Sequence, residues 1–183
     1  MNPVEPSKVY RLLYPQVPAI VSCNRNGVVF AMPVVSIISM SNDPPLVGVA
    51  ISPSHATHGA ISAPRCFSVC WLDASHLRAV EILGSTPPTT SDKLKSAGLR
   101  HHPGRELGAP IIQGSVAALE CSLHSRQAFG DHDLLVGNVR DAQANDDFRG
   151  YWRFRSYSPI LYVGTQEGEF RIYRRPARRG LGH

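Results

Sequence analysis

Short apolar runs separated by turn residues open the chain. Residues 19–23 form an apolar run, Asn26 and Gly27 follow it, and residues 28–30 resume the apolar pattern. Asn-Gly between two extended apolar runs is the strongest short-range indication of a β-hairpin. We therefore expect the chain to begin its fold with an antiparallel hairpin.

A β-branched run follows the hairpin and is interrupted by Pro33. Proline cannot donate to a strand ladder, so the stretch to Ser41 is predicted to be an edge strand or a bulged one, with some backbone amides left free for a ligand. Pro44 and Pro45 then precede residues 46–52, which are apolar almost throughout. That pattern predicts a strand buried on both faces.

The remaining pattern predicts more strands and a few short helices. Thr57 is placed to cap a helix over 58–63, and residues 76–83 and 91–98 have helical spacing, the last with a glycine stop at Gly98. Further strands are predicted over 66–71, 116–123, 134–139 and 160–163, with 170–173 as a weaker one. A mainly β chain with six or seven strands and peripheral helices predicts a closed or partly closed antiparallel barrel.

Composition narrows the class of protein. The chain has 183 residues, of which 43% are hydrophobic and 18% charged, with a mean hydropathy of −0.13, and these values fit one globular domain. Fifteen glycines and fifteen prolines argue against a helical bundle. The apolar run over 46–51 is too short to cross a bilayer, and the N-terminus does not resemble a signal peptide. We expect a cytoplasmic protein with no membrane partner.

The net charge of +5 comes from one end of the chain. Five arginines and no acidic residue lie in 171–183, and the other 14 basic and 14 acidic residues cancel. The charges therefore balance over 1–170, and we divide the chain into a domain over 1–175 and a basic tail over 176–183. A solvated tail without a nucleic-acid partner is the expectation; docking of nucleic acid or an anionic surface on the tail is the alternative.

The four cysteines are not spaced for metal binding. Cys23, Cys66, Cys70 and Cys121 form no CxxC and no paired spacing with histidine. Cys66 and Cys70 would lie roughly 13 Å apart along a strand, too far for a disulfide. We expect buried free thiols and no metal site.

No hydrolase, P-loop or dinucleotide fingerprint is present, but three segments place small polar residues beside an apolar strand. Ser36, Ser39 and Ser41 could bond a heterocycle or merely satisfy a bulged edge. Residues 52–57 offer hydroxyls and helix-terminal amides that suit a phosphate, or an ordinary helix cap. His132 enters a strand from a turn, either as a turn residue or as an imidazole at a pocket mouth.

Taken in order, these segments resemble the flavin reductase-like family of FMN-binding split barrels. The motif S-x-D-P-P-L-V-x-V is matched over 41–49, T-x-x-x-I over 57–61, F-x-V over 67–69 and G-D-H-x-x-x-x-G-x-V over 130–139. Weaker landmarks, mostly of the flavoredoxin-like branch, lie at 91–93, 109–110, 119–121 and 157–162. The resemblance covers roughly residues 8–173.

The resemblance implies a split barrel of Greek-key type and a role for individual residues. The ring of the flavin would be lined by Val34, Val35, Ser36, Ser39, Met40 and Ser41, and its phosphate would be held by Ser52, Ser54, His55 and Thr57. Ala50 and Lys93 are also assigned to the cofactor, and His132 is the candidate catalytic residue, near the ring or the nicotinamide, in the same or the partner subunit of a homodimer.

Three departures from the family pattern are visible. Val34 and Val35 replace a common Asn-Ala, Cys70 replaces an Asn after F-x-V, and the phosphate loop has no Lys or Arg, so that His55 would supply the charge there. These departures bear on flavin affinity and on the use of NAD(P)H.

The implied activity is an NAD(P)H-dependent flavin reductase that uses FMN, or FAD, and supplies reduced flavin to a monooxygenase. The cofactor carries the electronics of hydride transfer, and the protein supplies binding and orientation, which accounts for the missing catalytic signature. The alternative is an FMN-containing electron carrier of flavoredoxin type without nicotinamide turnover. A weaker alternative makes the arginine-rich tail the functional element.

Overall fold

The computed structural model describes residues 2–86, 93–166 and 170–174. The predicted tail over 176–183 lies outside the described residues. Among the described residues, the model has no helix that is both long and apolar enough to cross a bilayer.

The chain begins its sheet with the predicted hairpin, β1 (Ala19–Arg25) and β2 (Val28–Val34). Asn26 and Gly27 have φ values of 53° and 83°. This is the left-handed backbone that a two-residue hairpin turn requires and that asparagine and glycine tolerate best. The hairpin is therefore confirmed.

The second pair is β3 (Ile37–Asn42) with β4 (Pro45–Ile51), and the pairing shifts register between Ser39 and Ser41. The prediction of a bulged edge strand is confirmed for β3. The position of the interruption was wrong, because Pro33 pairs with Ile20 inside β2. β2 is itself an edge strand, where a missing N–H costs nothing, and the break falls two residues later.

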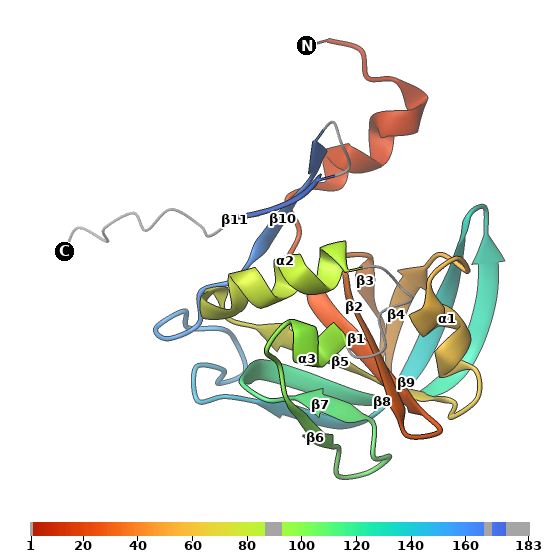
Figure 1. Ribbon diagram of the computed structural model, residues 1–183, viewed down its shortest axis with the longest axis vertical. Helices are drawn as coiled ribbons and strands as arrows, with labels where there is room; N and C mark the ends of the chain where they lie inside the picture. Colours follow the sequence, from red (N-terminus) through yellow and green to blue (C-terminus); the bar gives the residue numbers. More distant parts are fainter. Residues whose placement is uncertain (1, 87–92, 167–169, 175–183) are drawn as a thin grey trace.

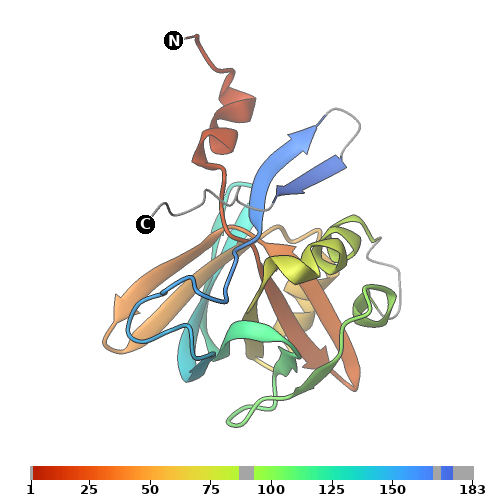
Figure 2. The same ribbon diagram turned by 90° about the vertical axis from the view of Figure 1, so that its left-hand side faces the viewer.

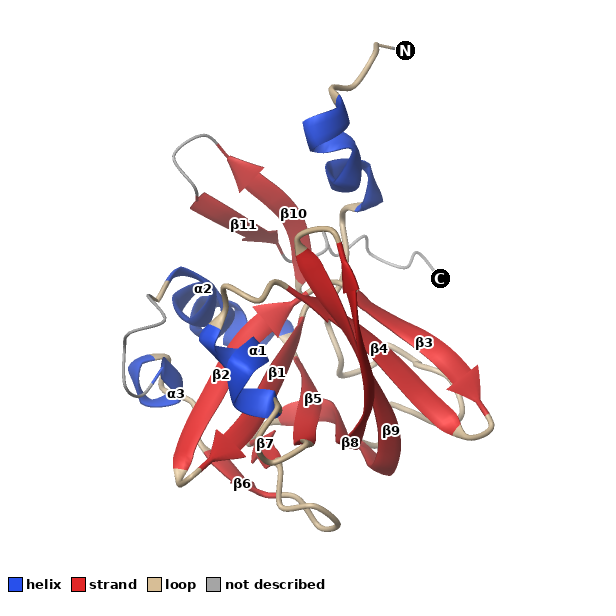
Figure 3. Ribbon diagram, turned by 90° about the vertical axis from the view of Figure 1, so that its right-hand side faces the viewer, coloured by secondary structure: helices blue, strands red, loops and turns tan. Residues whose placement is uncertain are grey.

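Seven strands form one sheet in the order β2-β1-β5-β8-β9-β4-β3. The new members are β5 (Cys66–Leu72), β8 (Ser115–Phe129) and β9 (His132–Ala144). β2 and β3 are consecutive in the chain yet lie at opposite edges, so the sheet curls until its edges approach each other (Figures 1 and 3). The N–H of Ala50 donates to the carbonyl of Ser36 at 2.9 Å and so continues the β3–β4 pairing by one residue into the link between β2 and β3. The seven-strand sheet is not closed, and the fold is a mainly β split barrel.

The interior of the barrel is apolar. Phe67, Val69, Val21 and Val49 are fully buried, and they belong to one core cluster. Gly137 of β9 lies so close to this cluster that a Cβ there would come within 2.6 Å of the Phe67 ring. The glycine of the G-D-H-x-x-x-x-G-x-V pattern is thus required by close packing.

The helices are short and lie outside the barrel, as predicted. They are α1 (Ala56–Ile61), α2 (Leu77–Ser85), which follows the 3₁₀ turn η2 (Ala74–His76), and α3 (Lys93–Ser96). The predicted cap of α1 was wrong: His55 occupies the N-cap position, and Thr57 is 4% exposed inside the helix. The expected start of the α3 helix at Ser91 and Asp92 lies outside the described residues.

Two smaller strand pairs are separate from the seven-strand sheet. β6 (His101–Pro103) pairs with β7 (Pro110–Ile112), and β10 (Leu161–Gln166) pairs with β11 (Phe170–Arg174). The last two predicted strands exist, but they pair with each other instead of joining the barrel. The unpredicted 3₁₀ helix η1 (Pro6–Leu13) and the β10–β11 hairpin project from the same end of the molecule (Figures 1 and 2).

The thiols are free, as expected. Cys23, Cys70 and Cys121 are buried, whereas Cys66 is partly exposed and so departs from the prediction. Burial raises the pKa of Cys23 and of Cys121 to about 12, so neither is a nucleophile at neutral pH.

Candidate functional site

A cavity of about 210 Å³ opens where the barrel is split. Its walls come from the end of β2 and the link to β3, from the end of β4, from the loop after β4, and from the first residue of β9. The lining residues are Tyr14, Met32, Val34, Val35, Ser36, Ala50, Ile51, Ser52, His55, His132, Tyr162 and Thr165. β2 and β4 both end at this cavity, so backbone groups and small side chains from their ends face it.

The loop after β4 supplies hydroxyl groups at one end of the cavity. The Oγ atoms of Ser52 and Ser54 lie 3.0 Å apart, and the N–H of His55 donates to the Ser52 carbonyl at 3.0 Å. These bonds fold the loop tightly against the end of β4. Ser52 and His55 line the cavity and offer a hydroxyl and an imidazole to an anionic group.

His132 stands at the tip of the long β8–β9 hairpin. Gly130 has a φ of 57°, and Phe129 pairs with His132 across the turn. The Nδ1 of His132 lies 2.8 Å from Oδ1 of Asp131, and this hydrogen bond lowers the pKa of the Asp131 carboxyl. The imidazole side chain is 44% exposed, so it meets both the cavity and solvent.

A buried pair holds this turn against α1. The Nε2 of His58 lies 2.8 Å from Oδ2 of Asp133, with side-chain exposures of 7% and 13%, and the Nε of Arg126 is 3.6 Å from the same carboxylate oxygen. The pair connects the helix that follows the serine loop with the strand that begins at His132. The two halves of the candidate site are therefore fixed relative to each other.

The structure brings seven of the sequence-predicted site residues together at this cavity. They are Val34, Val35, Ser36, Ala50, Ser52, His55 and His132. The others do not line it: Ser39, Met40 and Ser41 lie on the edge strand β3, Ser54 is exposed behind Ser52, Thr57 is buried in α1, and Lys93 begins α3.

Sequence reasoning missed the aromatic side of the cavity. The rings of Tyr14 and Tyr162 meet edge to face, with centroids 4.8 Å apart, and the Tyr162 hydroxyl lies 2.9 Å from Oγ1 of Thr165. Burial, and then the neighbouring Tyr162, raise the pKa of the Tyr14 phenol, which stays protonated at neutral pH. Tyr162 belonged to a family landmark, but the pattern around Tyr14 contains nothing that indicates a site.

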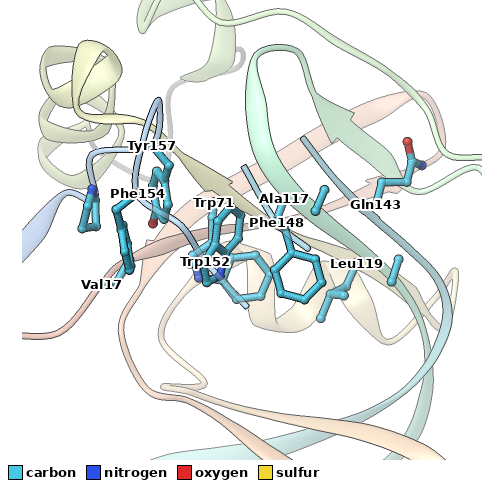
Figure 4. Close-up of a pocket in the computed structure, with 12 residues that line it drawn as sticks. Val17, Trp71, Ala117, Leu119, Gln143, Phe148, Trp152, Phe154 and Tyr157 are labelled. Atoms are coloured by element: carbon cyan, nitrogen blue, oxygen red, sulfur yellow. The ribbon is translucent and has the colours of Figure 1, made fainter. Parts of the chain in front are cut away.

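A second cavity of about 500 Å³ is lined by residues of β5, β8, β9 and the loops beside them, and its Trp71 and Leu119 also pack against the core cluster of the barrel (Figure 4). Its lining is aromatic and aliphatic, with Gln143 as the one amide or charged side chain among the lining residues. A phosphate-bearing ligand would find no cluster of donors there. The cavity at the split, although smaller, has the better chemistry for a nucleotide.

The residues at the split fit a flavin mononucleotide. Val34, Val35 and Ala50 provide a neutral, apolar wall for a flat ring, and the serine loop lies at one end for a phosphate. The volume is below the 300–1,000 Å³ usual for pockets that bury most of a ligand. One chain alone would therefore enclose only part of the cofactor.

Comparison with known proteins shows the family to which the chain belongs. Residues 10–164 match the family model described as a flavin reductase like domain. The chain is 32% identical over 166 residues to an uncharacterized protein of Aeropyrum pernix, covering 90% of this chain and 63% of that relative. It is 32% identical over 130 residues to an NADH-dependent FAD reductase of Streptomyces globisporus, covering 68% and 70% of the two chains.

A solved structure is similar over the whole length. The FMN-binding protein of Thermus thermophilus with bound p-hydroxybenzaldehyde superposes with a TM-score of 0.80 at 33% identity, covering 100% of this chain and 97% of that one. The similarity therefore extends beyond the barrel to both projecting segments.

Proposed function

Because the chain belongs to the flavin reductase-like family, we propose that it binds FMN in the cavity at the barrel split and passes a hydride from NADH or NADPH to the flavin. The observation that carries this proposal is that seven residues assigned from the family resemblance, scattered from position 34 to position 132, line one cavity. FAD is the alternative flavin, since a relative is named as an FAD reductase.

The bound flavin would supply the redox chemistry by accepting a hydride from reduced nicotinamide. The residues of this chain have three tasks. Val34, Val35 and Ala50 hold the ring in a water-poor wall, the Ser52 hydroxyl and the His55 imidazole bond the phosphate, and His132 positions the nicotinamide at the exposed side of the ring. Ser54, Thr57 and Lys93 would contact the phosphate only if it extends beyond Ser52.

Two further expectations belong to this proposal. We infer that the protein acts in the cytoplasm as a homodimer and delivers reduced flavin to a monooxygenase, with no membrane or nucleic-acid partner. The alternative function is an electron carrier that contains FMN and exchanges electrons with another protein. It is favoured by the phosphate loop without Lys or Arg, which departs from the pattern of reductases.

Anaerobic mixing of the FMN-loaded protein with NADH or NADPH, followed through the absorbance of oxidised flavin, tests the proposal. The wild type is expected to be reduced by at least one nicotinamide. His132→Ala should slow this step about tenfold or more while the Kd for FMN changes less than about threefold, because the loss falls on positioning in the transition state.

His124→Ala is the matched control, because His124 is an exposed histidine on the same hairpin outside the cavity. Normal reduction of the His132 variant would remove its assigned role. Tight FMN binding without reduction of the wild type by either nicotinamide would favour the electron carrier.

A further inference from the structure

The N-terminal arm, η1 over Pro6–Leu13, presents apolar side chains that the other described residues of its chain leave exposed. None of its residues is buried, and Val9, Tyr10, Leu12 and Leu13 are 52–68% exposed. An isolated 3₁₀ helix of eight residues is longer than such helices usually run, and a helix this short is marginal in water without tertiary packing. The arm therefore has the composition of a segment that packs on something outside its own chain.

The second cavity is an uncovered apolar surface, and we call it the aromatic groove. Trp71 of β5 and Trp152 are half-buried in it, and Phe148 and Phe154 are 41% and 58% exposed at its rim (Figure 4). Ring centroids of Phe148 and Trp152 lie 5.4 Å apart, and those of Trp152 and Tyr157 lie 4.7 Å apart. The rings support one another, so the groove is formed before anything docks.

A buried carboxylate fixes the loop that carries these rings. Asp147, 3% exposed, accepts hydrogen bonds from the backbone N–H groups of Arg155 and Tyr157 at 3.0 Å each and from Ser156 at 3.3 Å. A preformed apolar surface of this kind loses little conformational entropy on binding. Exposed contiguous apolar surface on a soluble domain marks an interaction site.

We propose that the N-terminal arm of one chain docks in the aromatic groove of a second copy, and that the exchange is reciprocal. The same chain supplies both surfaces, as a two-fold symmetric dimer requires. The arm leaves the body at Val17, which itself lines the groove, and then projects away from it (Figures 1 and 2). The arm is thus adjacent to the groove but directed outward, toward a neighbour.

Docking would also complete the cavity at the barrel split. Tyr14 follows the arm directly, lines that cavity, and stacks edge to face on both Tyr10 and Tyr162. A partner that holds the arm therefore holds one wall of the candidate flavin site. The inference names the surfaces of the homodimer stated under the proposed function, but it does not depend on hydride transfer.

Sedimentation of the full chain without flavin or nicotinamide tests the inference. The wild type is expected to dimerise, and both the arm variant Leu12→Asp/Leu13→Asp and the groove variant Phe154→Asp should weaken the dimer about 100-fold or more. Val28→Asp is the control, since Val28 is also an exposed apolar residue, at 47%, but lies at the tip of the β1–β2 hairpin. Circular dichroism of each variant verifies that it is folded.

Mixing the two defective variants gives the sharper result. In a homodimer of either variant, both arm–groove contacts include a substituted surface. In the mixed dimer, the intact arm of one variant meets the intact groove of the other. The mixture should therefore dimerise more tightly than either variant alone. A monomeric wild type would indicate an arm that docks on its own chain or a groove meant for another partner, and would overturn the proposal. Variants that dimerise normally, or a mixture without gain, would overturn it as well.

The result is independent of the redox proposal. A protein that dimerises as described but does not bind FMN contradicts the proposed function alone. If the protein binds and reduces FMN, but neither the arm variant nor the groove variant weakens its dimer, this inference alone is contradicted.

Discussion

Both carboxylate oxygens of the buried Glu120 accept hydrogen bonds from the backbone of a single loop. Glu120 is 1% exposed, and it accepts hydrogen bonds from the backbone N–H groups of Glu106, Leu107 and Ala109 at 2.8–2.9 Å. Gly104 closes the same loop so tightly that a Cβ there would lie 2.3 Å from the carboxylate. The residue organises structure and has no contact with the candidate cavity.

We expect Glu120→Ala to lower the free energy of unfolding by about 3 kcal/mol or more, because three buried donors lose a charged acceptor. Chemical denaturation of the variant beside Glu81→Ala, a carboxylate on the surface of α2, measures the difference. A variant as stable as the wild type would show that water replaces the carboxylate in the loop.

The proposed contact of the Ser52 hydroxyl with the phosphate can be tested separately from the binding of the ring, because riboflavin has the ring without the phosphate. Ser52→Ala should weaken FMN about 5- to 30-fold, the equivalent of one hydrogen bond to a charged group, and should leave riboflavin nearly unchanged. Parallel titrations with the two flavins give the comparison. Thr57→Val is the matched variant: an equal selective loss there would mean that the phosphate reaches the buried Thr57, and equal loss of both flavins by Ser52→Ala would place the phosphate elsewhere.

Single residues with a local physical reason were predictable. Asn26 and Gly27 specify their turn through backbone conformation, and the glycine of the family pattern at Gly137 is explained by its contact with Phe67. The pairing of His58 with Asp133, 75 residues apart, has no local pattern and required the fold. Thr57 was assigned as a cap from its residue type alone, and the backbone enters the helix two positions earlier than that assignment assumed.

At the scale of elements, strand existence followed from the apolar pattern but strand partners did not. The β10 and β11 strands were predicted, yet they form their own hairpin because nothing in a short apolar run states which strand it pairs with. The predicted interruption at Pro33 was two residues too early, and the link between the two edge strands lies at Val35–Ser36. β2 continues through Pro33 because an edge strand tolerates a residue without an N–H. The missed arm η1 has no strand pattern and no buried residue.

The loop that forms the aromatic groove should be sensitive to acid. Burial alone would raise the pKa of Asp147, but the hydrogen bonds from the N–H groups of Tyr157, Arg155 and Ser156 outweigh burial and hold that pKa below its ordinary value. A carboxyl with a lowered folded-state pKa stabilises the fold above its unfolded value of about 4, and this stability is lost as pH falls through the folded pKa.

We therefore expect Asp147→Asn to lower the Tm clearly at pH 7 and much less at an acidic pH that lies below the folded-state pKa, where the wild-type carboxyl is protonated too. Thermal unfolding at the two pH values measures the difference, and Asp146→Asn, with a 96% exposed side chain, is the control. An equal loss at both pH values would mean that the charge of Asp147 does not matter to the loop.

At the scale of the molecule, the open barrel explains where the candidate site lies. Closing the sheet would pair β2 with β3 and satisfy the backbone that now faces the cavity. A cavity of about 210 Å³ encloses only part of a flavin, and Tyr14 forms one of its walls. Docking of the projecting arm in the aromatic groove would therefore also affect the candidate site. The fold class was predictable from the ordered motifs, whereas this dependence on projecting segments was not.

Titration of the purified full chain with FMN, followed by quenching of flavin fluorescence, measures whether the cavity at the barrel split binds a flavin. We expect saturable binding of one FMN per chain. Ser36→Trp, which fills the cavity from an exposed link, should abolish this binding, whereas Val28→Trp at the far end of β2 should not. Folded wild-type protein that binds neither FMN nor FAD at tens of micromolar, or a Ser36→Trp variant that binds normally, would contradict the account.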